Sequence, residues 1–147
     1  MSLKQRLVDD MKTAMKAKDK LKLSVIRMAR AAIKNAEIDL KKELDEKEVV
    51  DVLAKEVKMR RDSIPEYERA GRQDLVDQLN EEIKILMNYL PEQLTAEEID
   101  AIVQDTIKEV NAQSIKDLGK VMAAIMPKIK GRADGKIVNE LVRQRLS

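Results

Sequence analysis

The sequence predicts an all-α protein, and three observations carry that prediction. Apolar residues recur at three- and four-residue spacing along most of the chain, and no convincing two-residue alternation typical of strands occurs. Aromatic residues make up only 1% of the chain, so the core is aliphatic, a composition that favours helix over sheet. With 147 residues the chain has room for one domain or two small ones. We expect an N-terminal bundle of about four helices followed by a C-terminal three-helix unit.

Two helices are expected in the first 41 residues. Apolar positions from Leu3 to Met15 recur at helical spacing, Ser2 is suited to cap this helix, and the polar run 16–18 ends it. Asp19 is the next candidate cap. The second helix combines an apolar face with small residues, which permits close packing against a neighbour.

A third and a fourth helix complete the first part. The third begins at residues 45–48, whose acidic side chains suit the positive end of a helix dipole. Pro65 lacks an amide hydrogen and crowds the preceding turn, so we expect a kink just before it and an end to the helix by Gly71. Apolar residues within 75–90 then define the fourth helix.

The segment 89–95 is the predicted boundary between the two parts. Pro91 disfavours helix in the residue before it, and Thr95 and Glu98 have the spacing of a reciprocal capping box. We therefore divide the chain into residues 1–90 and 91–147, with a fifth helix starting after Thr95.

Two further helices are expected in the second part. Ser114 and Asp117 have the spacing of another capping box, which would start the sixth helix. Pro127 either kinks or closes that helix, Gly131 suits the left-handed conformation at its end, and Asp134 suits the cap of the seventh helix. The glycines interpreted as structural are Gly119, Gly131 and Gly135.

Charge is distributed unevenly, although the formal net charge is only +2. Residues 114–147 contain eight basic and three acidic residues, whereas residues 95–113 contain one basic and five acidic residues. Cations around a turn that precedes a helix N-terminus are typical of phosphate contacts. The candidate RNA-binding residues are Lys120, Lys128, Lys130, Arg132, Lys136 and Arg143. The alternative interpretation is a set of solvated helix-end charges.

The first two expected helices are also basic. Their cations include Lys12, Lys16, Lys18, Lys20, Lys22, Arg27 and Arg30. We interpret this surface as a solvated face. An extension of an RNA surface and a contact with acidic lipid are the alternatives, and the second is disfavoured because the apolar stripes lack Trp and Phe.

No catalytic residue, metal site or cofactor is predicted. The chain has no His and no Cys, which removes the usual general base, the thiolate nucleophile and two common metal ligands. The stretch 131–137 lacks the spacing and the Ser or Thr of a nucleotide-binding P-loop. The carboxylate pairs Glu81-Glu82 and Glu97-Glu98 point in diverging directions on a helix, so we interpret both pairs as solvated.

The N-terminal residues are charged and amphipathic, and no stretch approaches the roughly 20 apolar residues of a membrane span. The absence of Cys agrees with a reducing compartment. We expect a cytoplasmic protein that does not contact membranes.

Three C-terminal motifs resemble the signatures of the GatB/YqeY family. They are YLPEQLTAEE at 89–98, DLGKVM at 117–122 and GRADGK at 131–136. The similarity continues at 9–12, 27–28 and 74–76, so the chain resembles the stand-alone YqeY-like proteins over essentially its whole length. This resemblance implies that the C-terminal unit is similar to the tail of the GatB subunit of tRNA-dependent amidotransferases, where it contacts the tRNA body. A related unit is appended to some glutaminyl-tRNA synthetases.

The resemblance implies tRNA-backbone contacts for the Gly131–Lys136 turn and for Lys120. The enzyme it points to acts on carbon-nitrogen bonds with glutamine as amide donor, but the large catalytic part of GatB has no counterpart here. We therefore expect a non-catalytic tRNA-binding module or accessory protein linked to aminoacyl-tRNA metabolism. An adaptor for a tRNA-handling enzyme is the alternative, and an amide hydrolase or amidotransferase-related enzyme is the weakest one. The expected partners are tRNA or another structured RNA and an aminoacyl-tRNA-handling enzyme.

Overall fold

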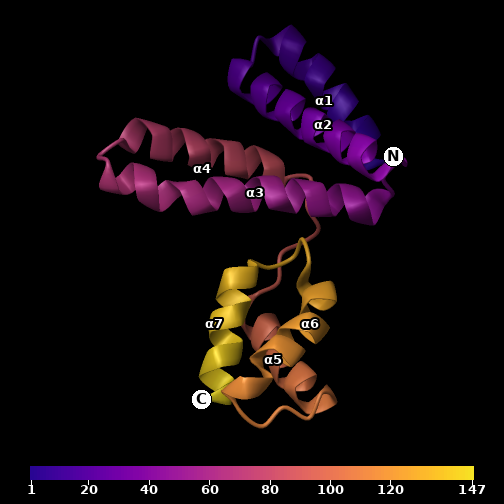
Figure 1. Cartoon of the computed structure of the whole chain (residues 1–147). Helices are drawn as coiled ribbons and strands as arrows, with labels where there is room; N and C mark the ends of the chain where they lie inside the picture. The colour runs from indigo at the N-terminus through magenta and orange to yellow at the C-terminus, as the bar shows by residue number, and fades with distance from the viewer. The chain divides into compact units, whose positions relative to one another are not determined.

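All regular secondary structure is helical in a computed structural model that describes residues 1–147 (Figure 1). The elements are α1 (Leu3–Ala17), α2 (Lys20–Leu40), α3 (Glu46–Arg69), α4 (Gln73–Met87), α5 (Ala96–Glu109), the 3-10 turn η1 (Ile115–Asp117), α6 (Leu118–Ile129) and α7 (Gly135–Leu146). The all-α prediction is confirmed. The chain divides into two compact units, unit 1 (Met1–Leu90) and unit 2 (Pro91–Ser147). No helix combines the length and the apolar character needed to cross a bilayer.

Helix starts follow local sequence signals. Ser2, Asp19 and Asp134 each accept a hydrogen bond from a backbone amide in the first turn of the helix that follows. Thr95 and Glu98 exchange both bonds of a capping box, each at 3.1 Å. These bonds satisfy amides that have no partner inside the helix, and all four predicted caps are confirmed.

The predicted capping box of Ser114 and Asp117 is wrong. Ser114 caps only the short turn η1, through a 3.3 Å bond from the amide of Lys116. The Asp117 carboxylate instead accepts a 2.8 Å bond from the amide of Gln113, which lies before the turn. The sixth helix therefore starts after a 3-10 turn and without a side-chain cap.

Neither proline ends its helix. α3 runs through Pro65 to Arg69, and α6 runs through Pro127 to Ile129. The fixed φ of proline is itself compatible with a helix, and both prolines are exposed and lie close to the C-terminal ends of their helices. α3 still ends before Gly71, whose φ of +70° suits a residue without a Cβ.

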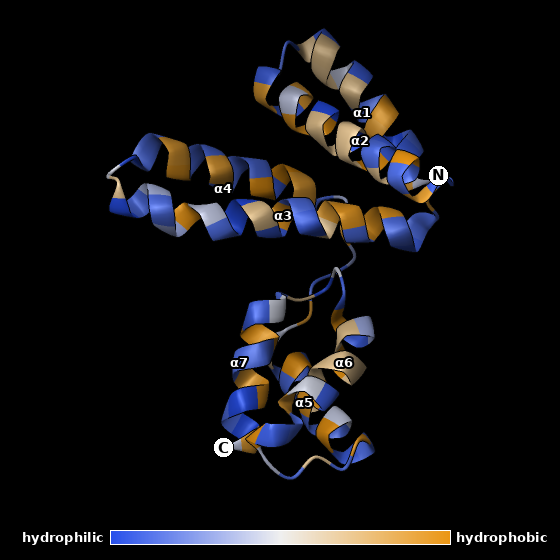
Figure 2. Cartoon of the chain, viewed as in Figure 1, coloured by the Kyte–Doolittle hydropathy of each residue, from blue (hydrophilic) through white to orange (hydrophobic).

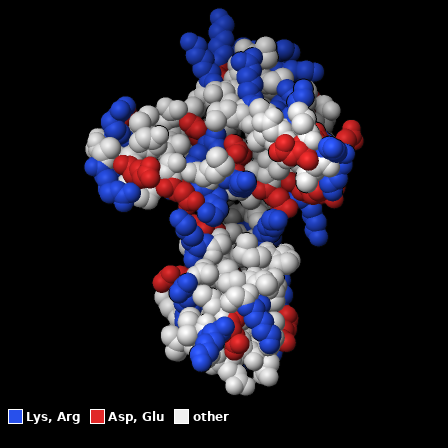
Figure 3. All heavy atoms as spheres, viewed as in Figure 1, with Lys and Arg blue, Asp and Glu red and all other residues white.

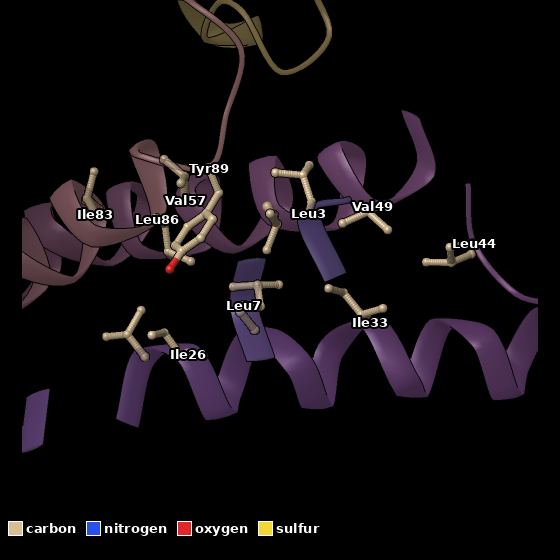
Figure 4. Close-up of a cluster of buried hydrophobic side chains, with 13 residues drawn as sticks. Leu3, Leu7, Ile26, Ile33, Leu44, Val49, Val57, Ile83, Leu86 and Tyr89 are labelled. Atoms are coloured by element: carbon tan, nitrogen blue, oxygen red, sulfur yellow. The ribbon is translucent and has the colours of Figure 1, made fainter. Parts of the chain in front are cut away.

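The core of unit 1 is aliphatic and is supplied by all four helices (Figure 4). Leu7, Ile26, Leu53 and Leu86, one from each helix, are almost fully buried. Figure 2 shows the corresponding apolar stripes, with hydrophilic residues on the other faces of the helices. Burial of these aliphatic stripes therefore stabilises the four helices of unit 1, which bury few aromatic side chains.

Tyr89 is the one aromatic residue in this core, and it connects the end of α4 with α1. Its hydroxyl donates a hydrogen bond to the Asp10 carboxylate, and the Arg6 guanidinium lies 4.9 Å from the centre of its ring. Burial, followed by the Asp10 carboxylate, raises the pKa of the Tyr89 hydroxyl above its usual value. The phenol therefore stays neutral and continues to donate at alkaline pH.

A buried ion pair joins α3 and α4. Arg60 Nε lies 2.9 Å from Glu82 Oε1, and the two residues are only 6% and 8% exposed. Arg60 Nη1 also lies 3.4 Å from Glu56 Oε1, and the side-chain amide of Gln78 donates to Glu82 Oε2 at 3.0 Å. The interpretation of Glu82 as solvated is therefore wrong, because a cation 22 residues earlier in the chain is packed against it.

Unit 2 has its own aliphatic core between α5, α6 and α7. Its buried residues are Ile99, Val103, Val121, Ile125, Ile129, Val138, Val142 and Leu146. Within each helix these residues are four positions apart, which keeps the apolar stripe on one face and leaves charged residues on the others.

Removal of the Glu82 carboxylate is expected to destabilise unit 1. Glu82→Ala leaves the buried Arg60 guanidinium without its main partner, and we expect a loss of about 3 kcal/mol in the free energy of unfolding. The matched control is Glu81→Ala, because Glu81 is exposed and pairs with an exposed Lys84. Its effect should stay below about 1 kcal/mol. Hydrogen exchange of α3 and α4 amides measures both changes, and equal effects would contradict the structural role of the pair.

Candidate nucleic-acid interface

The turn between α6 and α7 is fixed by hydrogen bonds from the segment that precedes α5. The amide of Leu94 donates to the carbonyl of Arg132 at 2.8 Å, and the side-chain amide of Gln93 donates to the carbonyl of Gly131 at 2.9 Å. Gly131 is buried and has a φ of +75°. The turn is therefore held in one conformation, and the cations on it start from a defined backbone.

The six predicted RNA-binding residues fall into two groups. Lys128, Lys130, Arg132 and Lys136 lie at the α6–α7 turn. Lys120 lies in the first turn of α6 and Arg143 in the last turn of α7, so these two lie at the opposite end of the helix pair (Figure 1). Lys120 and Lys128 are eight positions apart on α6, which corresponds to about 12 Å. The structure thus brings four of the six residues to one region.

Lys128 is engaged within unit 2. Its Nζ lies 2.8 Å from Glu109 Oε2 and 2.9 Å from the hydroxyl of Thr106, a threonine that is fully buried. The Thr106 hydroxyl in turn donates to the carbonyl of Ile102 at 2.7 Å. The ammonium group of Lys128 therefore connects α6 to α5, and we leave it out of the candidate surface.

The candidate surface consists of Lys130, Arg132 and Lys136, and we call it the turn surface. Lys130 and Lys136 are exposed, and Arg132 is half-buried. Arg132 Nε donates to the carbonyl of Glu92 at 3.3 Å. Three cations and one acidic residue, Asp134, lie within the seven residues 130–136, so the formal charge of this turn is positive.

The N-terminus of α7 is not an open anion site. The Asp134 carboxylate accepts a 2.9 Å bond from the amide of Lys136 at the position that a phosphate would take. The Asp134 carboxylate of the chain itself therefore occupies the place at this helix N-terminus where we expected a phosphate. Side chains, not backbone amides, supply the positive charge of the turn surface.

Part of the charge asymmetry along the sequence is neutralised inside unit 2. Arg145 forms a two-oxygen contact with Asp100 at 2.6 and 2.8 Å, and this contact lowers the pKa of the Asp100 carboxyl. With the Lys128–Glu109 pair, it joins the acidic helix α5 to both basic helices. Figure 3 accordingly shows cations and anions interspersed on the visible face of unit 2. Local spacing carries no signal for these pairs, because their members lie 19 and 45 residues apart.

Only one of the three glycines interpreted as structural in unit 2 needs to be glycine on conformational grounds. Gly131 has a positive φ. A Cβ at Gly119 would meet open space, so packing does not require glycine at this position. A Cβ at Gly135 would make only ordinary contact, 3.8 Å from the end of Met126.

No group of three or more carboxylate, His or Cys side chains has the arrangement of a metal site.

Fold and site together define a class: an all-helical protein in which a four-helix unit precedes a three-helix unit with a basic final turn. The chain belongs to the YqeY family, because the family profile described as "Yqey-like protein" matches residues 4–146. The resemblance inferred from the C-terminal motifs is thereby confirmed.

Relatives of two kinds are similar to this chain. Altered inheritance of mitochondria protein 41, mitochondrial, of Pyrenophora tritici-repentis is 32% identical over 142 residues, which cover 95% of this chain and 78% of that protein. The protein of the same name from Kluyveromyces lactis is 49% identical over 70 residues, 47% of this chain and 38% of the relative. A glutamyl-tRNA(Gln) amidotransferase subunit of Saccharolobus solfataricus is 44% identical over 57 residues, 36% of this chain and 9% of the relative. The chain thus matches less than half of the last two proteins.

Alanine substitutions at two glycines test the geometry of the turn. Gly131→Ala places a Cβ in the left-handed region and should destabilise unit 2 by about 1–2 kcal/mol. Gly119→Ala is the matched control, because this position is helical and open, and it should stabilise α6 by about 0.5 kcal/mol. Hydrogen exchange in α6 and α7 measures both. If Gly131→Ala left the stability of unit 2 unchanged, the turn would not have the conformation described here.

Proposed function

We propose that this protein binds the phosphate backbone of structured RNA, tRNA foremost, through the turn surface of unit 2, and that it has no chemistry of its own. The observation that carries the proposal is the shared sequence with an amidotransferase subunit named for its action on glutamyl-tRNA(Gln). The rigid turn with Lys130, Arg132 and Lys136 is the feature of unit 2 that suits such a ligand.

The residues around the turn favour recognition of shape over recognition of bases. Lys and Arg contact phosphates without reading sequence, and structured RNA is recognised largely through its backbone. Single-stranded RNA requires aromatic side chains on which bases stack. Both tyrosines of the chain, Tyr67 and Tyr89, belong to unit 1, and Tyr89 is buried. Unit 2 therefore has no stacking platform.

A second candidate function is that of an adaptor for a tRNA-handling enzyme, and one observation favours it. The last turn of α2 exposes two large apolar side chains, Ile38 at 63% and Leu40 at 57%, and exposed apolar surface is a feature of protein contacts. Association with such an enzyme that persists after nuclease treatment and is lost in Ile38→Ser/Leu40→Ser would support it. If the association were lost on nuclease treatment, RNA would be what connects this protein with the enzyme.

Removal of charge from the turn surface should weaken tRNA binding. The variant Lys130→Gln/Arg132→Gln/Lys136→Gln is expected to lose at least tenfold in affinity at low salt. Because each phosphate contact contributes about 0.7–0.9 to the salt slope, the slope of log affinity against log salt should decrease in magnitude by about 2. Filter binding with tRNA and with duplex DNA measures both quantities, and tRNA should bind more tightly than the duplex.

The matched control for that variant is Lys58→Gln/Arg72→Gln/Lys84→Gln. It removes the same charge from exposed residues of unit 1 that pair locally with Asp62, Asp74 and Glu81. Its tRNA affinity should stay close to that of the unmodified protein. Equal losses in the two variants would show that net charge, and not the turn surface, determines binding.

A further inference from the structure

A groove with a volume of about 540 Å³ lies between α1 and α2 of unit 1. Apolar lining comes from Leu7, Val8 and Ala31, and cationic lining comes from Arg27, Arg30 and Lys34 of α2, with Lys4 from α1. The three α2 cations lie three, four and seven residues apart and therefore share one face of the helix. We call Arg27, Arg30 and Lys34 the groove cations.

The groove cations have no anionic partner in the chain. Arg27 and Lys34 make no hydrogen bond and no ion pair, and both are exposed. Arg30 Nη1 lies 3.3 Å from the sulfur of Met11, which is only a weak acceptor. Three cations so close together repel one another, and an anionic ligand would relieve that repulsion.

The single acidic residue that lines the groove is already neutralised. The Glu37 carboxylate accepts hydrogen bonds from Lys4 Nζ and, at 2.9 Å, from the amide of Leu44. These two bonds, with Lys4 as the larger cause, lower the pKa of the Glu37 carboxyl. Glu37 is thus paired with Lys4, and it does not offset the positive charge of the groove cations.

The positive charge continues along α2 toward the α1–α2 connection. Lys20, Arg27 and Lys34 recur every seven residues, and at 1.5 Å per residue they span about 21 Å of helix. Eight basic residues and one acidic residue, Asp19, lie between residues 12 and 34. Asp19 is engaged as the cap of α2. Figure 3 shows the blue side chains gathered over this end of unit 1.

We propose that the α1–α2 groove is a second binding surface for the phosphodiester backbone of RNA, separate from the turn surface of unit 2. The inference rests on the proposed function, because it assigns the same class of ligand to unit 1. A row of cations about 21 Å long suits an extended polyanion better than a single phosphate. An anionic membrane is a poorer match, because α1 and α2 contain neither Trp nor Phe.

The experiment compares tRNA binding of full-length variants by fluorescence anisotropy at 50 mM and 200 mM salt. The groove variant is Arg27→Gln/Arg30→Gln/Lys34→Gln, and it is measured beside the turn-surface variant and the Lys58→Gln/Arg72→Gln/Lys84→Gln control. The groove variant should lose at least tenfold in affinity at 50 mM salt, and its salt slope should decrease in magnitude by about 2. Circular dichroism should show unchanged helix content, since the groove cations make no strong contact within the chain.

The outcomes separate this inference from the proposed function. If the groove variant binds like the control while the turn-surface variant is impaired, the groove inference is overturned and the proposed function stands. Impairment of the groove variant alone supports the groove and overturns the role of the turn surface. Binding of the unmodified protein to vesicles of anionic phospholipid, without binding to tRNA, overturns both.

Lysine acetylation read by mass spectrometry provides a measurement that needs no substitution. Bound tRNA should slow the acetylation of Lys34 and Lys20 severalfold. Lys58, which pairs with Asp62 on α3, is the internal control and should react at the same rate with and without tRNA. Unchanged reactivity of Lys34 at saturating tRNA would overturn the inference.

Discussion

Two hydrogen bonds from the start of unit 2 determine how its basic residues are presented. The amide of Leu94 and the side chain of Gln93 donate to consecutive carbonyls of the α6–α7 turn, those of Arg132 and Gly131. They attach the segment before α5 to the turn between the last two helices, and so close the three-helix unit at that end. They add to bonds within the turn, from the amides of Arg132 and Ala133 to the carbonyl of Ile129 at 2.8 and 3.0 Å, and together these bonds restrict the backbone that carries the cations. The proposed RNA contact depends on this closure.

The cations of unit 2 fall into two groups by their position in the fold. Lys128 and Arg145 hold α6 and α7 against the acidic helix α5. Lys130, Arg132 and Lys136 belong to the turn itself. The basic residues of unit 2 therefore include cations that join its helices and cations of the turn, to which we assign the proposed ligand. A count of charges along the sequence cannot distinguish them, because the distinction depends on which helix faces meet.

Unit 1 shows the opposite arrangement of charge and packing. Its most deeply buried ion pair, Arg60 with Glu82, lies between α3 and α4, where it is surrounded by side chains of the same network. The cations of the α1–α2 groove are exposed and make no comparable pairs. Buried charges need partners because desolvation is costly, whereas exposed cations remain available to a ligand. This contrast supports a binding function, and not a structural one, for the groove cations.

Features that depend on neighbours in the chain could be predicted from the sequence. Caps at Ser2, Asp19, Thr95 and Asp134 were predictable because each bond joins residues no more than three positions apart. The left-handed turn at Gly131 and the all-helical class follow from equally local signals: the freedom of a residue without a Cβ, and apolar residues at helical spacing. Which side chains meet across the helices was not predictable in this way. Packing buried Glu82 against Arg60, engaged Lys128 with Glu109, and brought α1 and α2 together around the groove. Helical periodicity shows which residues share a face, but not which face of another helix lies opposite. That choice is made by the whole aliphatic core, where residues far apart in sequence are buried together.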